Sequence, residues 1–338
     1  MRILEPFSVL IHFILLVGNC DAFLQSAPKS DGLRKLNASS GLSFDGSIEV
    51  SRTYQKDESS TDVTTTKHEI KYHIHNRMNL SSVQKAPILV LHGGPGVPSD
   101  YLHPLKDVIP YRSIVFYDQL GCGRSPGPEC KDAYSLKDSV DDLELLIKKC
   151  GLRRFHLYGQ SFGSILAFEY LKRLAEKSDG SRNESECLSV ILSSGPSDVD
   201  QVEGVAGDLI SKLMEEDNDE STIMERFRKR HQCQTEDKPQ PLIDAYDHAG
   251  KPGIWRGTDS IKGWKAEKPS DSASRMPSAL VMRGENDFVS DVCIQGWKQA
   301  FNHKFVRIKV LEGCSHHGLL EQPTVYGEIV DSFFSEYD

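Results

Sequence analysis

Short apolar runs recur along most of the chain, separated by polar stretches with the spacing of helices. Ile48–Val50 and Ile70–His75 alternate between apolar and polar residues, as expected for the two strands of a half-buried hairpin. The later runs are continuous and apolar, which is typical of strands covered on both faces of a sheet. These runs are Ile88–Leu91, Ile114–Tyr117, Phe155–Tyr158, Val190–Leu192, Ala279–Met282 and Val306–Leu311.

Helical patterns lie between several of these predicted strands. The clearest follows Ser135, which forms a capping-box start with Asp138, and Gly151 supplies its stop signal. Pro323 is expected to open the last helix. The core-facing stripe of that helix is predicted to contain Val325, Ile329, Val330 and Phe333. Because strands alternate with helices, we predict an α/β fold with a mostly parallel sheet.

The alternation of strands and helices stops between Ser197 and Met276, where the sequence is polar and favours helices. We therefore predict a helical lid at residues 197–276, inserted between two parts of one core at 45–196 and 277–338. A chain of 338 residues is long enough for such a core and insertion. Lids of this kind exclude water and shape the substrate pocket.

The first residues resemble a secretory signal peptide, which we place at 1–22. Arg2 precedes an apolar run, Phe7–Val17, that is too short to cross a membrane permanently. Residues 23–44 have the composition of a linker or a transit-like segment. We expect the protein in the secretory pathway or outside the cell; the alternative is a plastid, reached through a bipartite leader.

The net charge excludes some classes of binding partner. The formal net charge of −9 argues against nucleic acid and anionic membrane surfaces as partners.

Of the eight cysteines, Cys20 would leave with the signal peptide, and the remaining seven cannot all pair. Cys122 and Cys314 are expected in loops near the active site. The disulfide candidates, in an oxidising compartment, are Cys130, Cys150, Cys187 and Cys233.

A nucleophile-elbow motif, Gly159-Gln-Ser-Phe-Gly163, follows the predicted strand Phe155–Tyr158 and precedes a helix expected to begin near Ile165. The turn from strand to helix is sharp, so the residues two before and two after Ser161 must be small. Gly159 and Gly163 meet this requirement. Ser161 is therefore the predicted nucleophile.

A serine nucleophile needs a base and a carboxylate that orients the base. Asp287, in Gly284-Glu-Asn-Asp287, follows a predicted strand and is the expected acid, with Glu285 and Asp291 as alternatives. His316 follows the next predicted strand and is the expected base, with His317 as the alternative.

Two further histidines, His73 and His75, could share one face of a strand as metal ligands. No third ligand is evident in the sequence, so we expect an ordinary half-exposed strand pair. The prediction is an enzyme with no metal and no cofactor.

Acyl transfer also requires hydrogen-bond donors for the developing oxyanion. The N–H group of Phe162, after the nucleophile, is one predicted donor. The second is expected in the loop His92-Gly-Gly-Pro-Gly96, where glycines let the backbone approach a ligand. We predict the Gly94 N–H group, with Gly93 as the alternative; a plain Gly-Pro95 turn is the other interpretation of this loop.

Four ordered motifs together resemble the proline iminopeptidase family, which includes the tricorn-interacting aminopeptidases. They are His92–Gly96, Tyr117–Ser125, the elbow with Ser164 after it, and Gly284–Asp287. The resemblance implies an α/β-hydrolase fold and a serine aminopeptidase that releases N-terminal proline, or another small or apolar residue, through an acyl-enzyme. It gives Ser161, Asp287 and His316 the catalytic roles and makes Asp118–Ser125, including Gln119, a structural loop beneath the site.

One departure concerns the substrate amine, which members of that family are expected to bind with glutamates of the lid or near the triad. Phe288 follows the acid here, and Ile254-Trp255 stands in the lid where a glutamate would be sought. Other lid glutamates could substitute: Glu203, Glu216, Glu220 or Glu225. The alternative function is an esterase or amidase for small neutral acyl compounds, and a third is a binding module. The expected partner is a peptide or small acyl substrate, with the oligomeric state left open.

Overall fold

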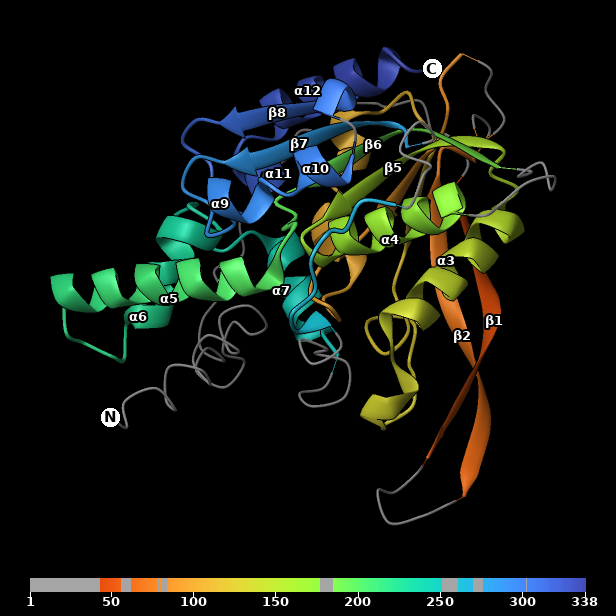
Figure 1. Cartoon of the computed structure of the whole chain (residues 1–338), viewed down its shortest axis with the longest axis horizontal. Coiled ribbons are helices and arrows are strands. Elements are labelled where there is room, and N and C mark those ends of the chain that lie inside the picture. The colour runs from red at the N-terminus through yellow and green to blue at the C-terminus, as the bar shows by residue number, and fades with distance from the viewer. Residues whose placement is uncertain are drawn as a thin grey trace, which may run out of the picture.

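A computed structural model describes residues 43–55, 62–77, 80, 84–176, 185–250, 261–269, 276–301 and 303–338. In this part of the chain an eight-stranded sheet has the order β1-β2-β4-β3-β5-β6-β7-β8 (Figure 1). The strands are β1 (Phe44–Gln55), β2 (Val63–His75), β3 (Ile88–Leu91), β4 (Ile114–Tyr117), β5 (Arg154–Gln160), β6 (Glu186–Ser193), β7 (Ser278–Gly284) and β8 (Val306–Leu311).

The predicted hairpin and parallel sheet are both confirmed. β1 and β2 pair antiparallel along their whole length, and β2 joins β4 antiparallel over Tyr72–His75 only. The pairs from β4 through β3 to β8 are all parallel. The far half of the hairpin therefore projects beyond the sheet as a two-stranded ribbon (Figure 1).

Alternating side chains of the strands build two apolar cores, one on each face of the sheet. Leu89, Val115 and Leu157 belong to one core, and their neighbours Val90 and Phe116 belong to the other. Helices α3 (Leu136–Cys150), α4 (Phe162–Glu176) and α10 (Trp297–Ala300) cover the first face. Helices α2 (Leu105–Val108), α11 (Gly318–Glu321) and α12 (Pro323–Ser335) cover the second.

The start and stop signals around α3 are confirmed. The Ser135 hydroxyl accepts the N–H of Asp138 at 3.0 Å, and Gly151 ends the helix with φ = 66°. Glycine supplies the stop because it adopts this left-handed backbone conformation more readily than other residues. Remaining short elements are η2 (Ser99–Leu102), η3 (Lys131–Ala133), α9 (Asp291–Ile294) and η6 (His303–Phe305).

Three predictions about these elements are wrong in detail. Val306–Leu311 is not covered on both faces, because β8 is the edge strand and Ile308 is 38% exposed. Val325 in α12 is 47% exposed, and Tyr326 takes its place in the buried stripe. Helix α4 begins at Phe162 rather than near Ile165, because the turn at Ser161 leads directly into it.

Helices occupy the described part of the segment between β6 and β7. They are α5 (Val199–Glu216), α6 (Ile223–Phe227), the π-helical turn η4 (Arg228–Gln232) and α7 (Gln240–Asp247). α5 and α6 lie at the carboxyl end of β7 and β8 (Figure 1). The lid boundaries 197–276 stay a prediction, and Ile254-Trp255 lies outside the described residues.

The expected signal peptide, nearly all of the following segment, and Cys20 also lie outside the described residues. In the part that the structure covers, no helix has the length and apolar character needed to span a membrane. The seven cysteines there are free thiols, so the disulfide candidates Cys130, Cys150, Cys187 and Cys233 do not pair.

Candidate active site

Ser161 lies on a tight turn between β5 and α4. Its φ of 52° is in the left-handed region, which is unusual for a residue with a side chain. A Cβ atom on Gly159 would overlap the backbone of Gly163, and one on Gly163 would overlap the Leu91 carbonyl oxygen. The Ser161 N–H group donates to the Ser193 carbonyl at 2.8 Å, which ties the turn to β6. Both glycines are therefore required for strand, turn and helix to fit together.

The predicted acid and base form a buried pair. Nδ1 of His316 lies 2.9 Å from Oδ1 of Asp287, which also accepts the Val289 N–H at 2.8 Å. A carboxylate can only accept, so Nδ1 of His316 carries the proton and Nε2 is left as the basic nitrogen. His316 and Ser161 line the same cavity.

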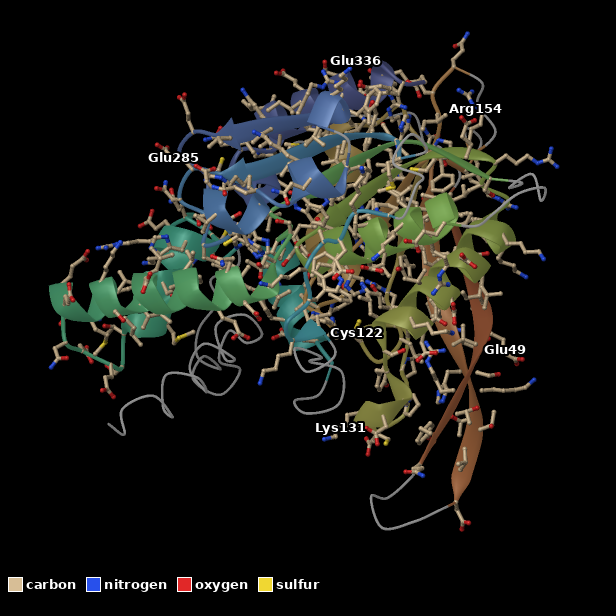
Figure 2. All side chains as sticks on the ribbon, viewed as in Figure 1. Glu49, Cys122, Lys131, Arg154, Glu285 and Glu336 are labelled. Atoms are coloured by element: carbon tan, nitrogen blue, oxygen red, sulfur yellow. The ribbon has the colours of Figure 1, made fainter. Side chains whose placement is uncertain are left out.

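The alternatives for the acid lie elsewhere. Glu285 is exposed on the loop after β7 and accepts the Gly313 N–H at 3.0 Å (Figure 2). Asp291 is paired with Arg283 at 2.6 Å and is 69% exposed. Asp287 is thus the carboxylate that the structure sets against His316.

His317, the alternative base, is buried beside His316 with ring centroids 5.3 Å apart. Its ring meets the edge of Tyr101, also at 5.3 Å, and its Nε2 has no hydrogen-bond partner in the structure. Burial and the adjacent His316 lower the pKa of His317 well below its usual range. The ring is therefore neutral near pH 7.

The loop after β3 contributes Gly94 to the lining of the cavity. Gly94 lines the cavity together with Ser161 and Phe162, and its φ of 112° favours glycine. The Gly93 N–H group donates to the Tyr101 hydroxyl at 2.8 Å. Of the two predicted donors, Gly93 is therefore already engaged, and Gly94 is the one that lines the cavity.

Three contacts hold the remainder of this loop. Nε2 of His92 accepts the Gln119 N–H at 2.8 Å, so Nδ1 carries the proton and lies 3.0 Å from the Gly93 carbonyl. Burial lowers the pKa of His92 and keeps the ring neutral. Gly96, after Pro95, accepts the Gly250 N–H through its carbonyl at 2.8 Å. His92 and Gln119 thus support the loop after β3.

Asp118 braces the neighbouring turn. One of its oxygens accepts the N–H and hydroxyl of Ser99, and the other accepts the N–H and guanidinium of Arg124. Burial raises the pKa of Asp118, but His92 and these hydrogen bonds outweigh it and hold the pKa below its usual value. The side chain has a supporting role and lies outside the lining of the cavity that contains Ser161.

Tyr101 and Gln160 are two residues that the sequence did not single out for a role. The Tyr101 hydroxyl donates to Oε1 of Gln160 at 2.6 Å, and Nε2 of Gln160 donates to the His316 carbonyl at 3.4 Å. Together with the Gly93 contact, they connect the loop after β3 to the loop that carries His316. Gln160 lies inside the elbow motif, but its partners come from distant segments that no local pattern reveals.

The cavity contains about 710 Å³ of empty space, including its open mouth. Its lining is mainly apolar, and Phe288 stacks on the His316 ring with centroids 4.2 Å apart. Gln232 and Tyr246 are the polar side chains that the described lid contributes. Among the lining residues in the described ranges there is no Asp, Glu, Lys or Arg.

The lid glutamates proposed for amine binding do not line this cavity. Glu216 is paired with Arg230, and Glu225 is paired with Arg228. Glu220 is exposed and Glu203 is half-buried on α5.

His73 bonds to Asp45 at 2.8 Å, and His75 lies two residues further along β2. Across the residues that the structure describes, no group of three or more His, Cys, Asp or Glu side chains could hold a metal ion.

Comparison with known proteins places this geometry in a family. Residues 86–323 match the family model for the alpha/beta hydrolase fold. A proline iminopeptidase of Saccharolobus solfataricus is 27% identical over 278 residues, covering 74% of this chain and 84% of the relative.

Two solved structures share the fold. VinJ superimposes with a TM-score of 0.65 and 20% identity, covering 86% of this chain and 99% of its own. The proline iminopeptidase of Mycobacterium smegmatis gives a TM-score of 0.61 and 22% identity, covering 85% and 98%. The chain therefore belongs to the alpha/beta hydrolase family.

Proposed function

We propose that this hydrolase works through a Ser161, His316 and Asp287 triad. The observation that carries the proposal is the 2.9 Å contact between His316 and Asp287, beside a cavity that also exposes a serine on a strained elbow. Gly94 and Phe162 supply the N–H groups of the oxyanion hole in this proposal.

The mechanism follows from these positions. His316 Nε2 takes the Ser161 proton as the hydroxyl oxygen attacks a substrate carbonyl. The Asp287 carboxylate stabilises the resulting imidazolium, and the backbone donors stabilise the oxyanion. His316 then gives the proton to the leaving group, the acyl-enzyme forms, and water releases the acyl group by the same steps in reverse.

The proposed reaction is release of an N-terminal residue, proline or another small apolar one, from short peptides. The proline iminopeptidase relatives support this substrate class, as does the mainly apolar lining of the cavity. The acyl group of such a substrate would lie against Phe288, Ile165 and Val199.

A second candidate is an esterase or amidase for small neutral acyl compounds. The observation that favours it is the uncharged lining of the cavity over the described residues. A buried polar group left without a hydrogen-bond partner costs roughly 2 to 7 kcal/mol. A buried ammonium without a carboxylate would cost more, because it also carries a charge. A neutral acyl group carries no such cost.

Two measurements test these proposals. A fluorophosphonate probe should label the wild-type protein and leave Ser161→Ala unlabelled; an unlabelled wild type would refute the serine mechanism. Turnover of prolyl-, alanyl- and leucyl-arylamides, compared with p-nitrophenyl esters, then separates the two substrate classes. Cleavage of esters alone would select the esterase.

Entry into the secretory pathway is also proposed, on the basis of the apolar run Phe7–Val17. Fusing residues 1–44 to a reporter and sequencing the processed N-terminus would test it. Cleavage near Ala22 is expected; an unprocessed reporter that stays in the cytosol would contradict it.

A further inference from the structure

The π-helical turn η4 of the lid contacts both loops that carry the acid and the base. A π turn inside a helical segment is rare and is found most often at functional sites. Here it follows directly on α6 and ends at Cys233, whose N–H donates back to the Arg228 carbonyl at 2.8 Å.

The first contact reaches the acid loop. Nδ1 of His231 lies 2.8 Å from the carbonyl oxygen of Asn286, the residue before Asp287. Since a carbonyl only accepts, Nδ1 of His231 is the donor. The N–H group of Asn286 donates to the Cys314 carbonyl at 2.9 Å, so this one residue joins the lid to the base loop.

The second contact reaches the base loop itself. The Gln232 carbonyl accepts the His317 N–H at 3.1 Å, one residue after His316. A few residues on, the Gln234 N–H donates at 2.6 Å to Glu321, which also accepts the Ser315 N–H at 2.7 Å.

Aromatic contacts connect the same segments as these hydrogen bonds. Phe227, at the end of α6, is fully buried with its ring centroid 5.8 Å from Phe288. Phe288 in turn stacks on the ring of His316 at 4.2 Å. The lid therefore fixes the Asn286–Phe288 segment through both its backbone and its side chains.

We propose that His231 is a positioning residue for the triad, which holds the Asp287 loop in the geometry that orients His316. This inference rests on the proposed serine mechanism. His231 lines no part of the cavity. It reaches the acid loop through its hydrogen bond to Asn286, and its ring also packs on Phe227 with centroids 5.4 Å apart. It makes the lid a structural part of the catalytic machinery, in addition to a cover over the substrate.

The test compares His231→Ala, His231→Asn and Arg230→Ala in the full chain. Asparagine places an N–H donor near the position of the histidine Nδ1, so it can restore the contact. Arg230 is the adjacent residue, half exposed and paired with Glu216, and serves as the matched control. The readouts are kcat, KM, the rate of fluorophosphonate labelling, and thermal unfolding.

For His231→Ala we expect kcat and the labelling rate to fall about 10- to 100-fold, because small misplacements of catalytic groups cost this much. KM should stay within about twofold, since the cavity lining is unchanged. His231→Asn should recover most of the loss, and Arg230→Ala should behave as wild type.

Equal labelling of His231→Ala and wild type would overturn the inference, as would a loss that His231→Asn does not repair or that Arg230→Ala shares. A wild type that the probe does not label would instead refute the serine mechanism. Labelling needs no knowledge of the substrate, so the two failures are distinguishable.

Discussion

Asp287 uses one carboxylate oxygen for two donors. Oδ1 accepts from both His316 and Val289, whereas Oδ2 is buried and has no hydrogen-bond partner in the structure. The Val289 contact fixes the carboxylate orientation, so that the imidazole meets a preset oxygen. Replacing one carboxylate oxygen of Asp287 by an amide NH2 group should therefore disturb its contact with His316.

Asp287→Asn should reduce turnover by about 10⁴-fold while leaving the fold intact, because an amide can donate to Nδ1 and so favour the wrong imidazole tautomer. Steady-state kinetics and circular dichroism measure the two effects. Glu285→Gln, on the exposed neighbour, is the control and should keep wild-type activity. Full activity in Asp287→Asn would return the role of acid to Glu285 or Asp291.

Gln232 is a polar side chain of the predicted lid that lines the cavity. Its Nε2 donates to the Tyr246 hydroxyl at 2.6 Å, which leaves the side-chain carbonyl as an uncharged acceptor at the cavity. Gln232→Glu keeps the shape and adds a negative charge. Gln201, exposed on α5, offers the same charge change away from the cavity.

We expect Gln232→Glu to raise kcat/KM for arylamides with a free amine about tenfold relative to their N-acetyl counterparts, the effect of one charge-assisted hydrogen bond. Gln201→Glu should leave this ratio unchanged. An unaltered ratio in Gln232→Glu would show that the substrate amine does not approach this part of the lid.

Among the secondary-structure elements, the junction of β5, Ser161 and α4 is the least tolerant. Gly163 packs against the carbonyl of Leu91 at the end of β3, the strand that leads into the loop with Gly94, the proposed oxyanion loop. Gly204 in α5, by contrast, has open space where a Cβ would be placed. Two glycines, both in helices, therefore have opposite requirements.

Gly163→Ala should destabilise the protein by about 1 to 3 kcal/mol through overpacking, and should reduce activity because the oxyanion loop must move. Gly204→Ala should instead stabilise it by about 0.5 to 1 kcal/mol, since alanine favours a helix. Thermal or urea unfolding of both variants decides the matter. Equal stability of the two would contradict the packing argument at the elbow.

Local patterns predicted most of these elements, and the failures have physical causes. Apolar runs such as Ile88–Leu91 identify buried strands, because both faces of the strand are covered in the same way. The exposure of Ile308 depends on β8 being the edge, which is a property of strand order and leaves no trace in six residues. The exposed Val325 likewise depends on how α12 is rotated against the sheet.

The candidate site likewise contains residues that local patterns predict and residues that they do not. Ser161, Asp287 and His316 follow predicted strands, and strand ends converge at one edge of a parallel sheet. His231 and Gln232 lie in a polar segment with no strand to fix their position, and their partners in the acid and base loops are more than 50 residues away. Tertiary packing alone brings them to the site.

For the molecule as a whole, buried histidines contribute to the response to acid. His156 is enclosed between Ser189 and Asp338 at 2.8 and 3.2 Å. Burial, assisted by Arg112 and opposed by Asp338, lowers the pKa of His156 from 6.5 to about 4. Burial also lowers the pKa of His103 to about 4.

A folded-state pKa below the unfolded value stabilises the protein above pH 6.5, and this contribution is lost as the pH falls through about 4. For His156 it is on the order of 3 kcal/mol. Urea unfolding at pH 7 and pH 4.5 should show this fall, and His156→Gln should reduce it. An identical pH dependence in His156→Gln would place the acid sensitivity in other groups.

Exchanging the predicted lid for that of another alpha/beta hydrolase would change more than the choice of substrate. A graft that replaces all of residues 197–276 also discards the imidazole donor to Asn286 and the carbonyl acceptor for His317. Such a chimera would fold around an intact sheet, yet the loops with the proposed acid and base would be held less firmly. Transplants that retain Phe227–Gln234 from this chain should keep their catalytic rate, which sets a practical limit on where the recombination points can lie.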